Sequence, residues 1–204
     1  MDIIAIQGAA GSYHDQAARA YFGSRYQPQF CMTFPEVFAA VEAGDAAYGV
    51  AASGNTIFGS IGEVHVLLQE YADRIKVVGE TGLAIHHCLI AQPGVGLEDI
   101  TEVHSQYMAL GQCGRFLRTQ LPQAKLVEED DTAMSVQLIK RQGNRAAAAV
   151  ASAAAAEIYG MSILRPNIED TPGNYTTFLI LQLQEQPALA ADKTGRPHST
   201  GLLR

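Results

Sequence analysis

The stretch GNYTTFLIL, residues 173–181, places two hydroxyl groups where a turn becomes a strand. Gly and Asn favour the turn, and the β-branched and aromatic residues that follow favour a buried strand. Adjacent hydroxyls at such a point fit ordinary strand chemistry, and they equally fit the edge of an active site. The residues alone leave both interpretations of Thr176 and Thr177 open.

Other candidate residues lie at turns that join an expected strand to an expected helix: Gly11 with Ser12, Asn55 with Thr56, Ser105, and Ser152. Such turns present backbone N–H groups and the positive end of the helix dipole, and ligands of open α/β sheets bind in that crevice. Several such turns facing one cleft would suit a substrate with more than one carboxylate. Ser and Thr are also the ordinary N-cap residues, so each turn taken singly has a purely structural explanation.

Other chemistries find little support. The turn GAAGS lacks the GK[ST] ending of a P-loop and the full GxGxxG spacing of a dinucleotide site. His86 and His87 are adjacent, so on a strand they would face opposite sides and could not chelate one ion together. Cys113 lies in an apolar helical pattern, which favours a core position over a nucleophile. The sequence therefore predicts no metal and no cofactor.

The elements that must position these residues alternate between strand and helix. Apolar strands are expected at residues 2–7, 29–33, 46–53, 124–129 and 174–184, with a long β-rich stretch at 75–92. Helices are expected after Ser12, Thr33, Ser60, Ser105, Asp131 and Ser152, several of them closed by Gly. This alternation predicts a mostly parallel, doubly wound α/β architecture.

Composition limits the partners. The chain has 204 residues and a formal net charge of −7, which argues against nucleic acid. Three widely spaced cysteines indicate reduced thiols, and no apolar run is long enough to span a membrane. With no basic leader visible, we expect a cytoplasmic protein that binds neither nucleic acid nor membrane. The polar segment 185–204 is predicted to be a disordered tail.

Six ordered motifs resemble the catalytic domain of prephenate dehydratase, from about residue 3 to residue 183. IAIQGAAGSYHDQAA is similar to the family's opening strand, turn and helix, and SGNTIFGSI to its E-N-S-x-x-G-S-V. SQYMALGQCGRFL is similar to S-H-P-Q-A-L-x-Q-C-x-x-F-L. DDTAMSVQLI, AAAVASAAAAEIYGM and IEDTPGNYTTFLIL are similar to three further family segments, the last to I-x-D-x-x-x-N-x-T-R-F-x-x-I.

The resemblance implies an α/β fold of two lobes with mostly parallel sheets and an interlobe cleft, like type II periplasmic binding proteins. Residues 1–78 with 165–184 would form the first lobe, and residues 79–164 the second. It also implies a reaction in which prephenate, a small dicarboxylate, loses its ring hydroxyl and ring carboxylate together to give phenylpyruvate. Such chemistry needs no metal or cofactor, because aromatisation drives it. A homodimer or homotetramer is usual in the family.

The resemblance also assigns site residues. Thr176 matches the Thr that the family links to catalysis. The implied substrate-binding residues are Gly11, Ser12, Asn55, Thr56, Ser105, Gln106, Asn174, Thr177 and Phe178. Several positions depart from the family pattern: Thr177 stands where the family has Arg, Gly54 where it has Glu, and Gln106 where it has His.

These departures gather in the cleft motifs, and they leave three hypotheses. The first is a dehydratase with a rearranged carboxylate site, without control by phenylalanine through a C-terminal ACT domain. The second is a prephenate decarboxylase of a secondary-metabolite pathway that keeps the ring hydroxyl. The third is a binding protein for a small anion that turns nothing over. Loss of an Arg that pairs with a substrate carboxylate costs roughly a few kcal/mol of binding free energy. A loss of this size would weaken the ordinary dehydration reaction.

Overall fold

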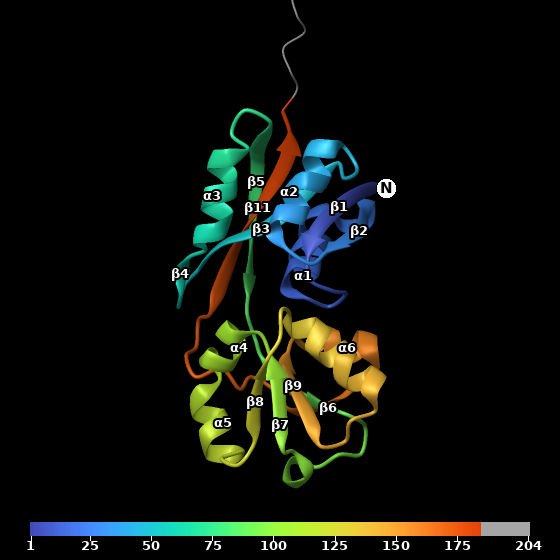
Figure 1. Cartoon of the computed structure of the whole chain (residues 1–204), viewed down its shortest axis with the longest axis vertical. Helices are drawn as coiled ribbons and strands as arrows, with labels where there is room; N and C mark the ends of the chain where they lie inside the picture. Colours follow the sequence, from blue (N-terminus) through green and yellow to red (C-terminus); the bar gives the residue numbers. More distant parts are fainter. Residues whose placement is uncertain (185–204) are drawn as a thin grey trace, which may run out of the picture.

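The computed structural model describes residues 1–184, which form two α/β lobes stacked along the long axis of the molecule (Figure 1). The predicted disordered tail, residues 185–204, lies outside the described residues. Within residues 1–184, no helix is long and apolar enough to cross a membrane. The predicted α/β class with two lobes is confirmed.

The first lobe is built on a six-stranded sheet with the order β2-β1-β3-β11-β5, and β4 pairs with β3. Its strands are β1 (Asp2–Gln7), β2 (Tyr26–Cys31), β3 (Tyr48–Asn55), β4 (Gly59–Ser60), β5 (Ile75–Ala84) and β11 (Tyr175–Leu183). Its helices are α1 (Tyr13–Phe22), α2 (Phe34–Ala43) and α3 (Gly62–Glu70). One apolar cluster packs α1 on the sheet, and a second packs α2 and α3.

The second lobe has a five-stranded sheet with the order β10-β6-β9-β7-β8. Its strands are β6 (Cys88–Ala91), β7 (Glu102–Ser105), β8 (Lys125–Glu128), β9 (Ala147–Ala151) and β10 (Ser162–Arg165). Its helices are α4 (Tyr107–Gln112), α5 (Gly114–Gln120), α6 (Thr132–Gln142) and α7 (Ala153–Tyr159). Helices α4 and α5 cover one face, and α6 and α7 cover the other.

Both sheets are mixed, whereas mostly parallel sheets were predicted. Strands β2, β1 and β3 pair in parallel, as do β8, β7 and β9. Antiparallel ladders form where the chain passes between the lobes, because β5 and β11 run in opposite directions on either side of the crossings. β6 and β10 pair antiparallel in the second sheet for the same reason.

The chain crosses twice between the sheets. It leaves the first sheet after β5 ends at Ala84, and it returns between the end of β10 at Arg165 and the start of β11 at Tyr175. β5 lies in the first sheet over its whole length, beyond residue 78, where the first lobe was predicted to end. The predicted lobe boundaries stay a prediction. Both crossings lie between the lobes (Figure 1), and they bring distant segments together: Ile85 N of the first donates to Asn174 O of the second at 2.8 Å.

Candidate active site

A cavity of about 730 Å³ lies between the two lobes. Residues from the first sheet and its loops, among them Gln7, Asn55 and Thr176, form one wall. Residues from the second lobe, among them His87 and Gln112, form the other. The volume is within the range of small-molecule sites.

Strand β11 aims Thr176 and Phe178 at the cavity and Thr177 away from it. Thr176 and Phe178 line the cavity and are buried, whereas Thr177 is half-buried and lies outside the cavity wall. This is the alternation that a regular strand imposes. Phe178 packs edge-on against His14, with ring centroids 5.1 Å apart, so the floor of the cavity beside Thr176 is aromatic.

The Thr176 hydroxyl is held by the amide side chain of Asn55, the last residue of β3. Asn55 Nδ2 donates to Thr176 Oγ1 at 2.9 Å and to Asn174 Oδ1 at 2.7 Å. Asn174 is 3% exposed, and its own Nδ2 donates to Gln112 Oε1 at 2.9 Å across the lobes. The three predicted site residues Thr176, Asn55 and Asn174 therefore meet, although 119 positions separate Asn55 from Asn174.

The other predicted residues divide into two groups. Gln106 lines the cavity at the start of α4. Ser12 and Ser105 point elsewhere: Ser12 Oγ caps α1 by accepting from Asp15 N at 3.2 Å, and Ser105 Oγ donates to Val150 O at 2.6 Å. Thr56 Oγ1 bonds to the backbone of Gly173 and Tyr175. The substrate-binding role assigned to these hydroxyls stays a prediction, and each already holds an internal hydrogen bond.

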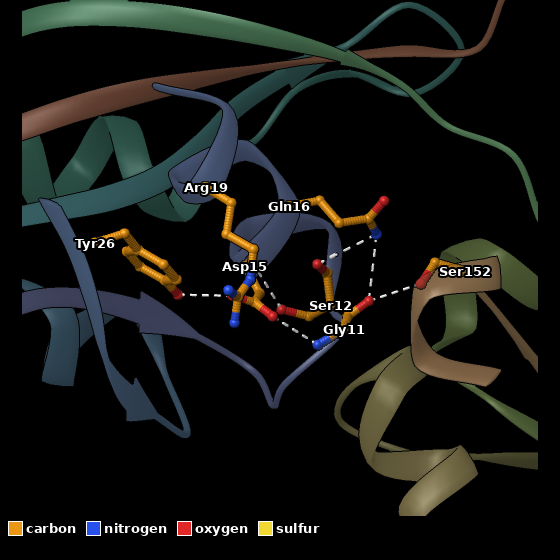
Figure 2. A network of polar contacts seen from close by, with 7 residues as sticks. All are labelled: Gly11, Ser12, Asp15, Gln16, Arg19, Tyr26 and Ser152. Carbon is orange, nitrogen blue, oxygen red and sulfur yellow. Dashed lines mark hydrogen bonds and ion pairs between the residues drawn. The ribbon is translucent and has the colours of Figure 1, made fainter. Parts of the chain in front are cut away.

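The turn that contains Gly11 and Ser12 joins the lobes, as its contact with Ser152 shows (Figure 2), and neither residue lines the cavity. The buried Asp15 carboxylate accepts from Gly11 N at 2.8 Å, from Tyr26 OH at 2.8 Å and from Arg19 Nε at 2.9 Å. On the far side of the turn, Ser152 Oγ at the start of α7 donates to Gly11 O at 2.7 Å. This network fixes α1 against the second lobe.

Close approach explains the two glycines of this turn. A Cβ on Gly11, which has φ +84°, would lie 2.7 Å from Ala155 Cα. A Cβ on Gly8, which has φ +98°, would lie 2.6 Å from Asp131 Oδ2. Both positions need positive φ and empty space at once, which only Gly supplies.

Two buried histidines at the cavity are held neutral. Burial lowers the pKa of His14 to about 4, and its Nε2 accepts from Ala52 N at 3.2 Å. Burial also lowers the pKa of His87, against the opposing hydrogen bond from Gln112. His87 lies in the first crossing, where Tyr13 OH is 2.8 Å from its Nδ1 and Gln112 Oε1 is 2.6 Å from its Nε2.

The charged groups of the cavity are acidic. None of its lining residues in the described chain is Lys or Arg, whereas Glu63, Asp130 and Asp131 are present. Asp131 caps α6 by accepting from Met134 N at 2.9 Å, and burial raises the pKa of its carboxyl. A bound carboxylate would have to rely on neutral donors, and the lining includes these: Gln7, Tyr13, Thr33, Ser60, Gln106, Gln112 and Thr132.

Tyr13, His87 and Gln112 were not predicted from sequence. Their bonds join residues 25 to 74 positions apart, so no local motif marks them. Cys113 lies in the core, as predicted, and burial raises the pKa of its thiol. No group of three or more His, Cys, Asp or Glu residues suited to a metal occurs within residues 1–184.

The chain is similar to several known proteins over nearly its whole length. Residues 4–186 match the family model described as prephenate dehydratase. The chain is 38% identical to arogenate dehydratase 5 of Arabidopsis thaliana over 98% of its length and 45% of that protein's. It is 36% identical to the bifunctional chorismate mutase/prephenate dehydratase of Neisseria gonorrhoeae, over 94% and 52%. It thus spans about half the length of these relatives.

Among solved structures, the prephenate dehydratase of Staphylococcus aureus superposes with a TM-score of 0.73 at 28% identity. That alignment covers 91% of this chain and 67% of the other. The two-lobed fold is therefore shared with a solved structure described as a prephenate dehydratase.

Proposed function

The chain belongs to the prephenate dehydratase family, and on that premise we propose that it converts prephenate into phenylpyruvate, carbon dioxide and water. The observation that supports this most is the buried Thr176 hydroxyl at the wall of the interlobe cavity, held by Asn55. Thr176 matches the position that the family resemblance links to catalysis, and a hydroxyl in a confined cavity can act on a departing group.

The proposed reaction breaks two bonds of one ring. Thr176 passes its hydroxyl proton to the ring hydroxyl as the C–O bond breaks, so that oxygen leaves as water, and Thr176 takes a replacement proton from solvent. The electron pair of the bond between the ring and its carboxylate moves into the ring, so carbon dioxide leaves and the ring becomes aromatic. The cavity contributes by holding the substrate so that both bonds are aligned with the ring π system.

The acidic cavity favours a second candidate substrate, arogenate. Arogenate carries an ammonium group where prephenate carries a ketone, and it would give phenylalanine by the same elimination. The cavity has Glu63, Asp130 and Asp131 but no Lys or Arg among its described lining residues. Such a wall attracts an ammonium group and repels a second carboxylate. Some relatives at 37–38% identity are described as arogenate dehydratases.

Product analysis separates the hypotheses. The protein is incubated with prephenate or with arogenate, and the products are identified by mass spectrometry. Phenylpyruvate or phenylalanine supports the proposed elimination and shows which substrate is used. A product heavier by one water, with carbon dioxide released, would instead show decarboxylation with the ring hydroxyl retained. Binding of either compound without any product would support the binding-protein hypothesis.

We also propose that the protein assembles as a homodimer or homotetramer, as the family resemblance implies. Light scattering of the purified full chain gives its mass in solution. A mass of one chain, 21.8 kDa, over the working concentration range would contradict the proposal.

A further inference from the structure

The hydrogen bonds that link the side-chain amides of Asn55, Asn174 and Gln112 have a fixed donor-to-acceptor direction. A backbone turn sets this direction. Ile57 N and Phe58 N both point at Asn55 Oδ1, at 2.9 and 3.2 Å. Backbone N–H groups only donate, so the atom that they contact must be the amide oxygen. The Asn55 NH2 group must then face β11.

The two protons of that NH2 group set the polarity of the next residues. One goes to Asn174 Oδ1 and the other to Thr176 Oγ1. Thr176 therefore accepts from Asn55, and its single O–H proton is not needed for that bond. No protein acceptor for this proton is found within the described chain, and Thr176 lines the cavity. The hydroxyl proton is directed toward whatever the cavity holds.

The same logic continues into the second lobe. Because Asn174 presents its oxygen to Asn55, its NH2 group faces Gln112 Oε1. An oxygen there can only accept, so the ring nitrogen at 2.6 Å, His87 Nε2, must carry a proton. The neutral His87 ring then has a lone pair on Nδ1, which takes the proton of Tyr13 OH at 2.8 Å in preference to the carbonyl oxygen of His86, 2.9 Å from the same hydroxyl.

We propose that Gln112 and His87 are positioning residues for Thr176. The Nε2–H tautomer of His87 fixes Gln112 Oε1, and this oxygen holds the amide groups of Asn174 and Asn55 in one orientation. In that orientation the Thr176 proton stays free to be donated into the cavity. The tautomer and the amide orientations stand independently of any reaction. The effect on turnover rests on the proposed function. A network that only stiffened the crossings would have the same tautomer but no such effect on turnover.

Asn174→Asp tests the direction of the network without a substrate. The new carboxylate still accepts from Asn55, but it cannot donate to Gln112. Gln112 must turn its NH2 group toward residue 174, and the same group then faces His87 Nε2. His87 Nε2 must now accept, so its proton moves to Nδ1, which donates to Tyr13 OH. Tyr13 can donate in turn to His86 O, at 2.9 Å.

Nitrogen-15 NMR of the imidazole rings at pH 8 shows which nitrogen carries the proton. The wild type is expected to show Nε2–H for His87, and Asn174→Asp to show Nδ1–H alone. The His87 signal is assigned by its loss in His87→Gln. Asn144→Asp makes the same change in the loop before β9, outside the cavity, and should leave the His87 spectrum as in the wild type. A wild type without Nε2–H, or a proton still on Nε2 in Asn174→Asp, would overturn the proposal.

Steady-state kinetics test the consequence for turnover. Gln112→Leu removes the shared acceptor and should lower kcat by about tenfold, the scale of one misplaced catalytic donor, while KM changes less. Gln112→Glu keeps an oxygen for both donors and should recover several-fold of that loss. Gln92→Leu is the matched control, because Gln92 bonds to Ile139 O outside the cavity. An unchanged kcat in Gln112→Leu, or no recovery in Gln112→Glu, contradicts the positioning role.

The two measurements separate failure of this inference from failure of the proposed function. If the wild type yields no elimination product from prephenate or arogenate, the proposed function fails, and the NMR result still decides the network. If the wild type is active and the tautomer does not respond to Asn174→Asp, the network proposal fails alone.

Discussion

The Thr176 hydroxyl is the group on which the proposed chemistry depends most directly. It is 8% exposed, accepts from Asn55 and has its proton available to the cavity. Thr176→Ala should lower kcat by ~10²-fold, the usual scale for one positioned donor, while the fold is kept. Thr176→Ser keeps the hydroxyl and should keep most of the turnover. Equal turnover by Thr176→Ala and the wild type would show that this residue only builds the strand.

His14 predicts a stability that depends on pH. Its pKa is about 4 in the folded protein because burial disfavours the charged ring, and about 6.5 in the unfolded chain. The unfolded chain therefore binds more protons between these values. Stability is fully present above pH 6.5 and is lost as pH falls to 4, by about 3 kcal/mol for a shift of this size.

Urea unfolding of the wild type and of His14→Gln at pH 7, 5.5 and 4 measures this contribution. Gln can still accept from Ala52 N, but it does not titrate. The difference in unfolding free energy between the two proteins should shift in favour of His14→Gln as pH falls. A difference that stays constant from pH 7 to pH 4 would rule out a buried neutral His14.

At the scale of single elements, local chemistry in the sequence predicted several helix starts correctly. Ser12, Thr33 and Ser152 cap their helices as expected, and Gly143 closes α6 in the left-handed conformation. Ser60 was expected to open α3, but it pairs with Gly54 in β4, so the helix begins two residues later without a side-chain cap. A cap is a contact within four residues, whereas a short edge strand depends on a partner that sequence spacing does not reveal.

The turn at Gly11 should be sensitive to substitution for two reasons that can be separated. Gly11→Ala imposes positive φ on Ala and also places Cβ 2.7 Å from Ala155 Cα of the second lobe. Gly44→Ala imposes the same kind of φ, +77°, with nothing within 4 Å. We expect Gly44→Ala to cost about 1 kcal/mol of stability, and Gly11→Ala clearly more, together with a loss of turnover. Equal costs in denaturant unfolding would show that the lobes do not touch at this point in solution.

Two departures from the family pattern lie opposite each other on neighbouring strands. Thr177, where the family has Arg, is paired with Gly54, where the family has Glu. Opposite charges at such a pair stabilise a sheet by about 0.2–1 kcal/mol. Once the Arg at position 177 is absent, a Glu at position 54 no longer has a partner to stabilise. Thr177 lies outside the cavity wall. The absence of a charged side chain at this position therefore affects the stability of the sheet at least as much as substrate binding.

A double-mutant cycle tests this pairing. Gly54→Glu and Thr177→Arg, made singly, should each leave a charge without its partner, and the double variant should recover about 0.5–1 kcal/mol of unfolding free energy. The same variants also test the effect of Thr177→Arg on the substrate: tighter prephenate binding would mean that the new Arg reaches it. Strictly additive free energies would show that the two side chains do not meet.

For the whole molecule, the α/β class followed from the alternation of strand and helix, and the central site residues from motifs within single segments. The meeting of Asn55, Asn174 and Gln112 did not follow, because it depends on how the two crossings bring β3, β11 and α4 together. His87 lies in such a crossing, where no periodic pattern reveals burial. Such contacts between lobes are set by tertiary packing, which local propensity does not encode.

The charge of the whole molecule predicts an unusual response to salt. The chain carries a formal charge of −7, and part of that charge, Glu63, Asp130 and Asp131, lines the cavity, where the described lining residues include no Lys or Arg. A dianion such as prephenate is therefore repelled on approach, and salt screens that repulsion, since the Debye length falls from about 30 Å at 0.01 M to about 8 Å at 0.15 M. KM for prephenate should fall by roughly two- to threefold over this range. A site built on a cation would show the opposite trend.

Matched variants locate the source of this effect. Glu63→Gln combined with Asp130→Asn neutralises the exposed acids of the cavity and should flatten the salt dependence of KM. Glu70→Gln combined with Asp73→Asn makes the same change in net charge outside the cavity and should leave most of the dependence in place. For zwitterionic arogenate, the slope should be smaller than for prephenate because its ammonium group offsets one carboxylate. A KM for prephenate that rises with salt in the wild type would mean that a cation reaches the cavity, and the neutral-donor description of carboxylate binding would then be wrong.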